Sequence, residues 1–263
     1  MYDFEYQRAT SVDDALKKHS NSDDARFLAG GMTLIPVLKQ RLDQPSDVVD
    51  LGDLADMQGI SQDGNSIIIK AMTTHHSVNS SQLVTEKIPA LAYLAGTIGD
   101  QMVRNRGTIG GSLANSDPAA SYPSAVLALN ATIKTNTREI NSDDFFTGMF
   151  DTALEDGELI LSVSFPIPEE AGYKHFPNPA SRYPIVGSFV AKTSNDVRVA
   201  ITGAGPCAFR VDDFEVALAN NYNPEEIRDI KVPDEGLSSD IHASAEYRAH
   251  LINVMTRRAI GGQ

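Results

Sequence analysis

Two pairs of adjacent glycines are the residues of this chain whose type and spacing could bind an anion. One pair, Gly110-Gly111, lies in the stretch RGTIGGSLANSDP between two hydroxyl side chains, and the other, Gly30-Gly31, lies in LAGGMTLI. Without a Cβ, glycine lets the backbone approach a large ligand and donate N–H bonds to it. Two such loops together could hold both phosphates of a dinucleotide, although either pair taken singly is also typical of a tight turn or a close helix–strand contact.

Regular elements are expected on both sides of each glycine pair. Residues 26–29 predict a short buried strand, and Thr33 can cap a following helix in which Pro36 falls in the first turn. The apolar positions of that helix recur at three and four residues: Leu34, Val37, Leu38 and Leu42. A strand, a glycine pair and a helix start bind anions well, because free N–H groups and the positive dipole end face one ligand. A second helix, over residues 89–103, is expected to lead to the other pair.

The remaining pattern predicts an α+β fold with two domains. Ser11 followed by Asp14 resembles an N-terminal capping box and indicates a helix over residues 12–19. The expected strands are 48–51, 67–71, 131–134, 159–165, 185–192, 197–202 and 209–211, and further helices are expected at 124–131, 215–220 and 246–260. Pro166, Pro168 and Gly172 mark the clearest boundary. We therefore expect domains at 1–168 and 169–263, the first with subdomains of about 1–55 and 56–168.

Composition excludes several classes of protein. The net charge of -13 disfavours binding to DNA or RNA. No apolar run is long enough to span a membrane, and the N-terminal stretch lacks the features of a signal peptide, so we expect a cytoplasmic protein. Cys207 is the only cysteine, which excludes an internal disulfide and a cluster held by several thiolates of this chain. Any redox metal must be carried by a partner.

Common catalytic motifs are absent from the sequence. It contains no GxxxxGK[ST] and no GxGxxG that opens a strand–helix unit, and Cys207 lacks a basic neighbour and is interpreted as a small buried hydrophobe. His75 and His76 are adjacent and have no acidic or thiol ligand at metal-binding spacing, so a hydrogen-bonded structural role is favoured. What remains is a two-loop pyrophosphate site in an α+β domain, which fits a flavin dinucleotide.

Several blocks resemble one family when read in order. LAGGMTLIPVLKQRL, TTHH, VRNRGTIGGSLANSDPAASYP, DFFTGMFDTALEDGELI and ASAEYRAHL are similar to the FAD-binding medium subunit of the molybdenum hydroxylases, of the aerobic carbon monoxide dehydrogenase type. The resemblance covers nearly the whole chain. It implies an FAD-binding domain of the p-cresol methylhydroxylase and vanillyl-alcohol oxidase type, with two subdomains, followed by a small C-terminal α+β domain with a three-stranded antiparallel sheet.

The resemblance also implies which residues meet FAD. Two loops would enclose the pyrophosphate, one of them Leu28, Ala29, Gly30, Gly31, Met32, Thr33, Leu34 and Ile35, and the other Thr108, Ile109, Gly110, Gly111 and Ser112. The remaining positions would lie near the dinucleotide or the flavin: Ile98, Asp117, Ser121, Ile160, His175 and Tyr183. Tyr183 matches an aromatic residue that lies against the isoalloxazine ring. No catalytic residue and no metal ligand is expected.

Departures from the family pattern are informative. Ser121 stands where many relatives carry a carboxylate that contacts FAD, so we expect weaker binding at that edge. His175 and Pro179 replace a lysine and an arginine, and Arg182 stands where an aspartate is common. In xanthine dehydrogenases this region governs NAD access, so its change favours a quinone or another carrier as acceptor. No histidine matches the position of a covalent flavin link, and FAD is expected to be non-covalent.

The resemblance implies an electron-transfer flavoprotein subunit. Electrons would come from the molybdenum cofactor of a large partner through iron–sulfur clusters of a small partner, and leave to an external acceptor such as a quinone. A dimer of heterotrimers is expected, in the cytoplasm or at the inner face of the membrane. A stand-alone flavin oxidoreductase of the same superfamily and a cofactor-free interaction module remain alternatives. The primary substrate, whether carbon monoxide, a purine, an aldehyde or an aromatic acid, is left open.

Overall fold

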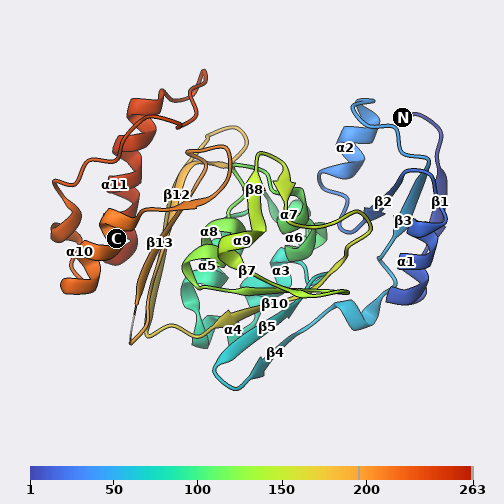
Figure 1. The fold of residues 1–263 in the computed structure, drawn as a ribbon, viewed down its shortest axis with the longest axis horizontal. Helices are drawn as coiled ribbons and strands as arrows, with labels where there is room; N and C mark the ends of the chain where they lie inside the picture. Colours follow the sequence, from blue (N-terminus) through green and yellow to red (C-terminus); the bar gives the residue numbers. More distant parts are fainter. Residues whose placement is uncertain (195, 262–263) are drawn as a thin grey trace.

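The three larger sheets of the described residues follow one another along the length of the molecule (Figure 1). The computed structural model describes residues 1–194 and 196–261. A three-stranded sheet lies at the N-terminal end, a five-stranded sheet with most of the helices lies in the middle, and a four-stranded sheet backed by helices forms the C-terminal end. The expected α+β architecture with a small C-terminal sheet domain is therefore confirmed.

The first sheet is parallel and places the first glycine pair. Its strand order is β1-β3-β2, with β1 at Glu5–Arg8, β2 at Ala25–Leu28 and β3 at Asp47–Asp50. Helix α1, Val12–Ser20, begins as predicted, because the Ser11 side chain accepts a hydrogen bond from the Asp14 N–H. Strand β2 ends just before the glycine pair, and α2, Leu34–Lys39, begins just after it.

The middle of the molecule is built on an antiparallel sheet. Its order is β4-β5-β10-β6-β7, from Ile60–Asp63, Ser66–Lys70, Ile160–Pro166, Thr132–Thr135 and Glu139–Asn141. The helices of this part are α3 His75–Ser80, α4 Gln82–Lys87, α5 Pro89–Thr97, α6 Gln101–Arg106, α7 Ile109–Asn115, α8 Tyr122–Ala128 and α9 Ser142–Phe145. Smaller elements are a 3-10 turn at Ala55–Met57 and the hairpin strands β8 Phe146–Gly148 and β9 Asp151–Thr152.

The helix expected over residues 89–103 is wrong as a single element. The chain breaks between α5 and α6 at Gly99, whose φ is +53°, and the Asp100 side chain caps α6 by accepting a hydrogen bond from the Val103 N–H at 2.9 Å. Met102, an apolar residue near the end of the expected helix, is 78% exposed. Leu42 is likewise 73% exposed, because α2 ends before it. Apolar spacing therefore overestimated the length of both helices.

The C-terminal sheet has four strands instead of three. Its order is β11-β12-β13-β14, from Glu170–Pro177, Pro184–Lys192, Val197–Thr202 and Phe209–Arg210. Strand β11 occupies the stretch that was interpreted as a boundary. Gly172 is not a turn residue there: a Cβ at this position would lie 2.0 Å from the Ala259 carbonyl oxygen, so glycine permits close packing on the last helix.

The helices of the C-terminal part close its own apolar core. They are α10 Asp212–Asn220, the 3-10 turn at Pro224–Ile227 and α11 Ala245–Gly261. A second core forms between this sheet and the helices, with Phe214 and Ile252 fully buried. The main core is separate, and it joins residues of the first and middle sheets with a few from β11, β12 and β13.

Candidate functional site

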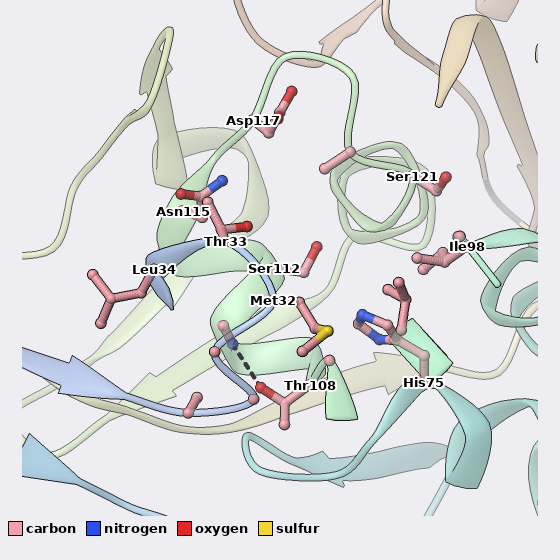
Figure 2. Close-up of a pocket in the computed structure, with 18 of the residues that line it drawn as sticks. Met32, Thr33, Leu34, His75, Ile98, Thr108, Ser112, Asn115, Asp117 and Ser121 are labelled. Carbon is pink, nitrogen blue, oxygen red and sulfur yellow. Dashed lines mark hydrogen bonds between the residues drawn. The ribbon is translucent and has the colours of Figure 1, made fainter. Parts of the chain in front are cut away.

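A cavity of about 570 Å³ opens where the three parts of the chain meet. Figure 2 shows side chains from the first glycine stretch, from α7 and from the start of α8 around it. The third side comes from Ser181, Arg182 and Tyr183 of the loop between β11 and β12, and from Pro184 at the start of β12. The volume of the cavity lies in the usual range for a small-molecule or cofactor site.

The first glycine stretch carries the free donors of the cavity. Among the described residues, the five successive backbone N–H groups of residues 30–34 have no hydrogen-bond partner. Gly31 has a φ of +73°, which only glycine adopts readily. A turn with a left-handed residue can gather successive N–H groups into a concave anion-binding surface. The Thr33 hydroxyl does not cap α2, contrary to expectation, and is also free of hydrogen bonds in this part of the structure. This stretch is suited to an anionic group such as a pyrophosphate.

The second glycine pair plays a different part from the one expected. It lies in the first turn of α7, and its N–H groups are already bonded within the chain. The Ile109 N–H donates to the Thr73 carbonyl at 3.1 Å, and the Gly110 N–H donates to the Ala71 carbonyl at 2.8 Å. The Gly111 N–H donates to the Thr108 hydroxyl at 3.1 Å (Figure 2). This loop therefore offers the cavity side-chain hydroxyls and an uncrowded surface, while the free N–H groups come from the first loop.

Glycines also bring the two loops together. A Cβ at Gly30 would lie 2.0 Å from the carbonyl oxygen of Arg106, just before the second loop. A Cβ at Gly110 would lie 2.6 Å from the Ala71 Cβ and 2.8 Å from its carbonyl oxygen. Both positions include a contact to a backbone carbonyl oxygen that no other residue type permits without movement. By contrast, the space above Gly111 meets only Thr108 Oγ1 at 3.0 Å and Ala29 Cβ at 3.5 Å.

The C-terminal part completes the cavity through a short ordered loop. The Asn178 side chain accepts hydrogen bonds from the Ala180 and Ser181 N–H groups. Arg182, at φ +66°, then reaches across and donates from Nη1 to the Gly99 carbonyl at 3.1 Å. Tyr183 follows and lines the cavity with 46% of its surface exposed. An exposed aromatic ring beside a cavity is well placed to stack on a planar ligand.

Asp117 is the acidic residue of the cavity lining. Burial raises the pKa of its carboxyl, although Oδ1 accepts a hydrogen bond from the Ala119 N–H at 2.8 Å, which acts in the opposite direction. Ser121 stands nearby, 7% exposed, at the start of α8. The position at which the family resemblance implies a carboxylate is part of the lining here, as a hydroxyl.

The Asp117→Asn substitution is expected to stabilise the ligand-free protein at neutral pH. As pH rises above the ordinary value of 3.8, the unfolded chain loses this proton before the folded chain does. Stability therefore falls across the window from 3.8 up to the raised pKa, and asparagine removes that loss while it keeps an acceptor for the Ala119 N–H. The Asp117→Asn variant should melt at a higher temperature than wild type at neutral pH, and the two melting temperatures should converge below pH 3.8. The exposed Asp63→Asn is the control, and an equal gain in it would assign the effect to net charge.

Thirteen of the nineteen predicted site residues line the cavity. They are Ala29, Gly30, Gly31, Met32, Thr33, Leu34, Ile98, Thr108, Gly111, Ser112, Asp117, Ser121 and Tyr183. The other six are not among the lining residues: Leu28, Ile35, Ile109, Gly110, Ile160 and His175. Ile109 and Ile160 are buried in the main core, and His175 stacks on Tyr173 within β11 at a ring distance of 5.5 Å.

Several lining residues were missed by reading the sequence. Asn115 follows Gly111 and Ser112 by one helical turn, so a helix rather than a loop over TIGGS would have placed all three on one face. His75 was expected to be hydrogen-bonded in a structural role. Instead it begins α3 and lines the cavity, and the structure gives its ring nitrogens no hydrogen-bond partner among the described residues.

Metal and membrane features are not found in the described part of the chain. Residues 1–194 and 196–261 hold no group of three or more His, Cys, Asp or Glu side chains that could bind a metal ion. Over the same residues, no helix has the length and apolar character needed to cross a membrane. Cys207 is half-buried, and burial raises the pKa of its thiol.

The cavity fits a flavin dinucleotide. Consecutive free N–H groups suit a pyrophosphate, the hydroxyls of Thr108 and Ser112 suit a polar chain, and Phe27, Ile98 and Tyr183 give apolar and aromatic surface for planar rings. Side chains of both glycine stretches lie close together at the cavity, as Figure 2 shows for Thr33 and Ser112. FAD has a charged pyrophosphate between two flat ring systems, and the N–H donors and apolar surfaces of the cavity match these parts.

Comparison with known proteins agrees with this geometry. Residues 2–168 match the family described as the FAD binding domain in molybdopterin dehydrogenase. The nicotine 6-hydroxylase medium subunit of Paenarthrobacter nicotinovorans is 35% identical over 97% of this chain and 95% of its own. The glyceraldehyde dehydrogenase medium chain of Sulfolobus acidocaldarius is 33% identical over 98% and 97%. The structure of reconstituted CO dehydrogenase from Oligotropha carboxidovorans superposes with a TM-score of 0.88 at 29% identity, over 99% and 97% of the two chains. The chain belongs to the FAD-binding medium subunits of the molybdenum hydroxylases, which are flavoprotein subunits of oxidoreductases.

Proposed function

We propose that this chain is the electron-transfer subunit of a molybdenum hydroxylase, and that it passes electrons from a partner's iron–sulfur clusters to an external acceptor such as a quinone. The observation that carries the proposal is a dinucleotide cavity with five free N–H groups on one side and, in the described residues, no metal-binding cluster of its own. FAD supplies the redox chemistry when bound. The residues of the chain bind it, orient it and shield it from water.

The residues proposed to hold FAD follow from their positions in the cavity. The backbone of residues 30–34 would donate to the pyrophosphate, and Thr108 and Ser112 would hydrogen-bond beside it. Tyr183 would lie against the isoalloxazine ring. Ile160 and His175 lie outside the lining and would act through the residues in front of them. With no histidine matching a covalent attachment position, the flavin would be held non-covalently.

Partners and organisation are proposed from the same family. A large subunit with the molybdenum cofactor and a small iron–sulfur subunit would complete the enzyme, as a dimer of heterotrimers. The FAD-binding part would end near residue 168, after which the four-stranded sheet begins. Its subdomains, about 1–55 and 56–168, would hold the three-stranded and the five-stranded sheet respectively. The complex would lie in the cytoplasm, at the inner face of the membrane where the acceptor is a quinone.

The acceptor provides a direct test of the electron-transfer role. The chain would be tagged in its native host and the complex purified, with molybdenum, iron and flavin quantified. After reduction by dithionite and removal of the excess, a soluble quinone analogue should reoxidise the flavin rapidly, while NAD should be much slower. Reoxidation by NAD at the faster rate would overturn the assignment of the acceptor. Isolation of the chain with bound flavin but with neither partner metal would favour a stand-alone flavoprotein.

A further inference from the structure

His75 is the imidazole of the cavity lining and is held there by backbone and ring contacts. The backbone N–H of His75 donates to the Gly107 carbonyl at 2.9 Å, and the His75 ring packs on Tyr122 with centroids 5.4 Å apart. Figure 2 shows the side chain directed into the cavity beside Met32 and Ile98. Only glycine fits beside the ring at position 107, because a Cβ at Gly107 would lie 2.6 Å from Nε2. The imidazole is therefore fixed in place.

The ring of His75 is nevertheless without hydrogen bonds. Nδ1 is fully enclosed and has no partner, and no group of the described residues bonds Nε2. A buried polar group that lacks a partner costs about 1–3 kcal/mol relative to a satisfied one. Its exposed fraction is only 5%, so bulk water does not compensate. Since Nδ1 is enclosed, Nε2 is the nitrogen that a molecule in the cavity can reach.

The charge state of His75 is also defined by its surroundings. Arg104 on α6 and Tyr122 on α8 are the titratable side chains that face it. Burial, with a smaller contribution from the Arg104 guanidinium, lowers the pKa of His75 to about 4. The imidazole is therefore neutral at physiological pH and offers one donor and one acceptor.

We propose that His75 is a positioning residue that hydrogen-bonds the bound FAD through Nε2. The proposal rests on FAD occupying this cavity, and it deepens that assignment by naming a side chain outside both glycine loops. A neutral imidazole fixes the orientation of a polar ligand atom without bringing a positive charge next to it. The missing partners of the ring are then explained by the ligand rather than by the fold.

A purely structural histidine would behave in the opposite way. A histidine that stabilises the fold would leave the ligand-free protein weaker when replaced. Leucine at position 75 instead removes an unpaired buried polar group, so the ligand-free melting temperature should stay the same or rise. Glutamine can place its amide near the position of Nε2 and should restore the bond to FAD. Rescue by glutamine and the stability of the leucine variant separate the two roles.

The test compares His75→Leu, His75→Gln and the wild-type full chain in FAD titrations, with melting temperatures measured without FAD. His76→Leu is the matched control, since His76 is the adjacent residue, is exposed and contacts Gln101 outside the cavity lining. We expect His75→Leu to bind FAD roughly 3- to 10-fold more weakly, and His75→Gln to stay within about twofold of wild type. FAD affinity of the wild type should show no inflection between about pH 5 and pH 8, because a neutral His75 does not titrate there.

Three outcomes would overturn the proposal. The first is a His75→Leu variant that binds FAD as tightly as wild type. The second is a ligand-free His75→Leu variant that melts at a clearly lower temperature while its FAD affinity matches that of wild type. The third is an inflection in FAD affinity near the ordinary histidine pKa that His75→Gln abolishes. Failure of the wild-type chain to bind FAD at all would instead overturn the proposed function. The two failures are therefore distinguishable in the same experiment.

Discussion

Replacing Gly30 with alanine is expected to abolish FAD binding and to destabilise the protein. The new Cβ would lie 2.0 Å from the Arg106 carbonyl oxygen and 2.9 Å from the Gly107 Cα, both of them backbone atoms. Because backbone cannot rotate aside as a side chain can, the two glycine loops must separate. Overpacking against backbone should cost at least about 3 kcal/mol of unfolding free energy. Loss of the loop contact would also disperse the free N–H groups of residues 30–34.

Chemical denaturation and FAD titration of the Gly30→Ala variant measure both effects. Gly148→Ala is the matched control, because the nearest atom to its new Cβ is Asp151 Cβ at 3.7 Å, an ordinary contact in the β8–β9 hairpin. We expect Gly148→Ala to stay close to wild type in stability and FAD affinity. If Gly30→Ala keeps wild-type stability, the two loops do not depend on the close approach seen in the structure.

Replacing Gly111 with aspartate is expected to abolish FAD binding while the fold is kept. Gly111 lines the cavity, and a Cβ there meets no backbone, only Thr108 Oγ1 at 3.0 Å and Ala29 Cβ at 3.5 Å. A carboxylate beside the proposed pyrophosphate would repel it by about 4 kcal/mol at about 4 Å with an effective dielectric constant of about 20. FAD affinity should therefore fall by more than about 100-fold.

The neighbouring glycine gives a sharp contrast. Gly110→Ala would push a Cβ to 2.6 Å from the Ala71 Cβ and 2.8 Å from its carbonyl oxygen, so this variant should lose stability first. Circular dichroism and thermal melting of both variants, beside FAD titration, separate loss of the site from loss of the fold. Gly111→Ala should bind FAD more weakly than wild type but better than Gly111→Asp. Full flavin content in Gly111→Asp would mean that α7 does not face the cofactor.

The sequence predicted the two loops because glycine pairs and neighbouring hydroxyls are local patterns that can be read without the tertiary fold. It did not predict which loop supplies the free N–H groups. The donors of α7 bond Thr73 and Ala71, which lie more than thirty residues earlier, and only the tertiary fold shows this. The backbone N–H groups of residues 30–34 are therefore the ones left free to bind a ligand. The resemblance to a known family supplied the identity of the dinucleotide, which spacing alone left open.

Other features depended on contacts between distant segments. Strand β11 was missed because only Tyr173 of its eight residues is fully buried, which leaves no alternating pattern to read. His75 was misinterpreted because its burial is created by Gly107 and Tyr122, far along the chain. The break at Gly99 was hidden because the apolar spacing continues through it. Propensity and periodicity describe an element, but tertiary packing decides where it ends and what it faces.

The measurement that tests the account most directly is the flavin content of the purified full chain. One FAD per chain should bind after incubation with excess cofactor and gel filtration, with an absorbance band near about 450 nm. Acid precipitation should then release all of the flavin into the supernatant, because the link is non-covalent. A correctly folded, colourless chain that rejects added FAD would contradict the account, and flavin that remains with the precipitate would contradict its non-covalent attachment.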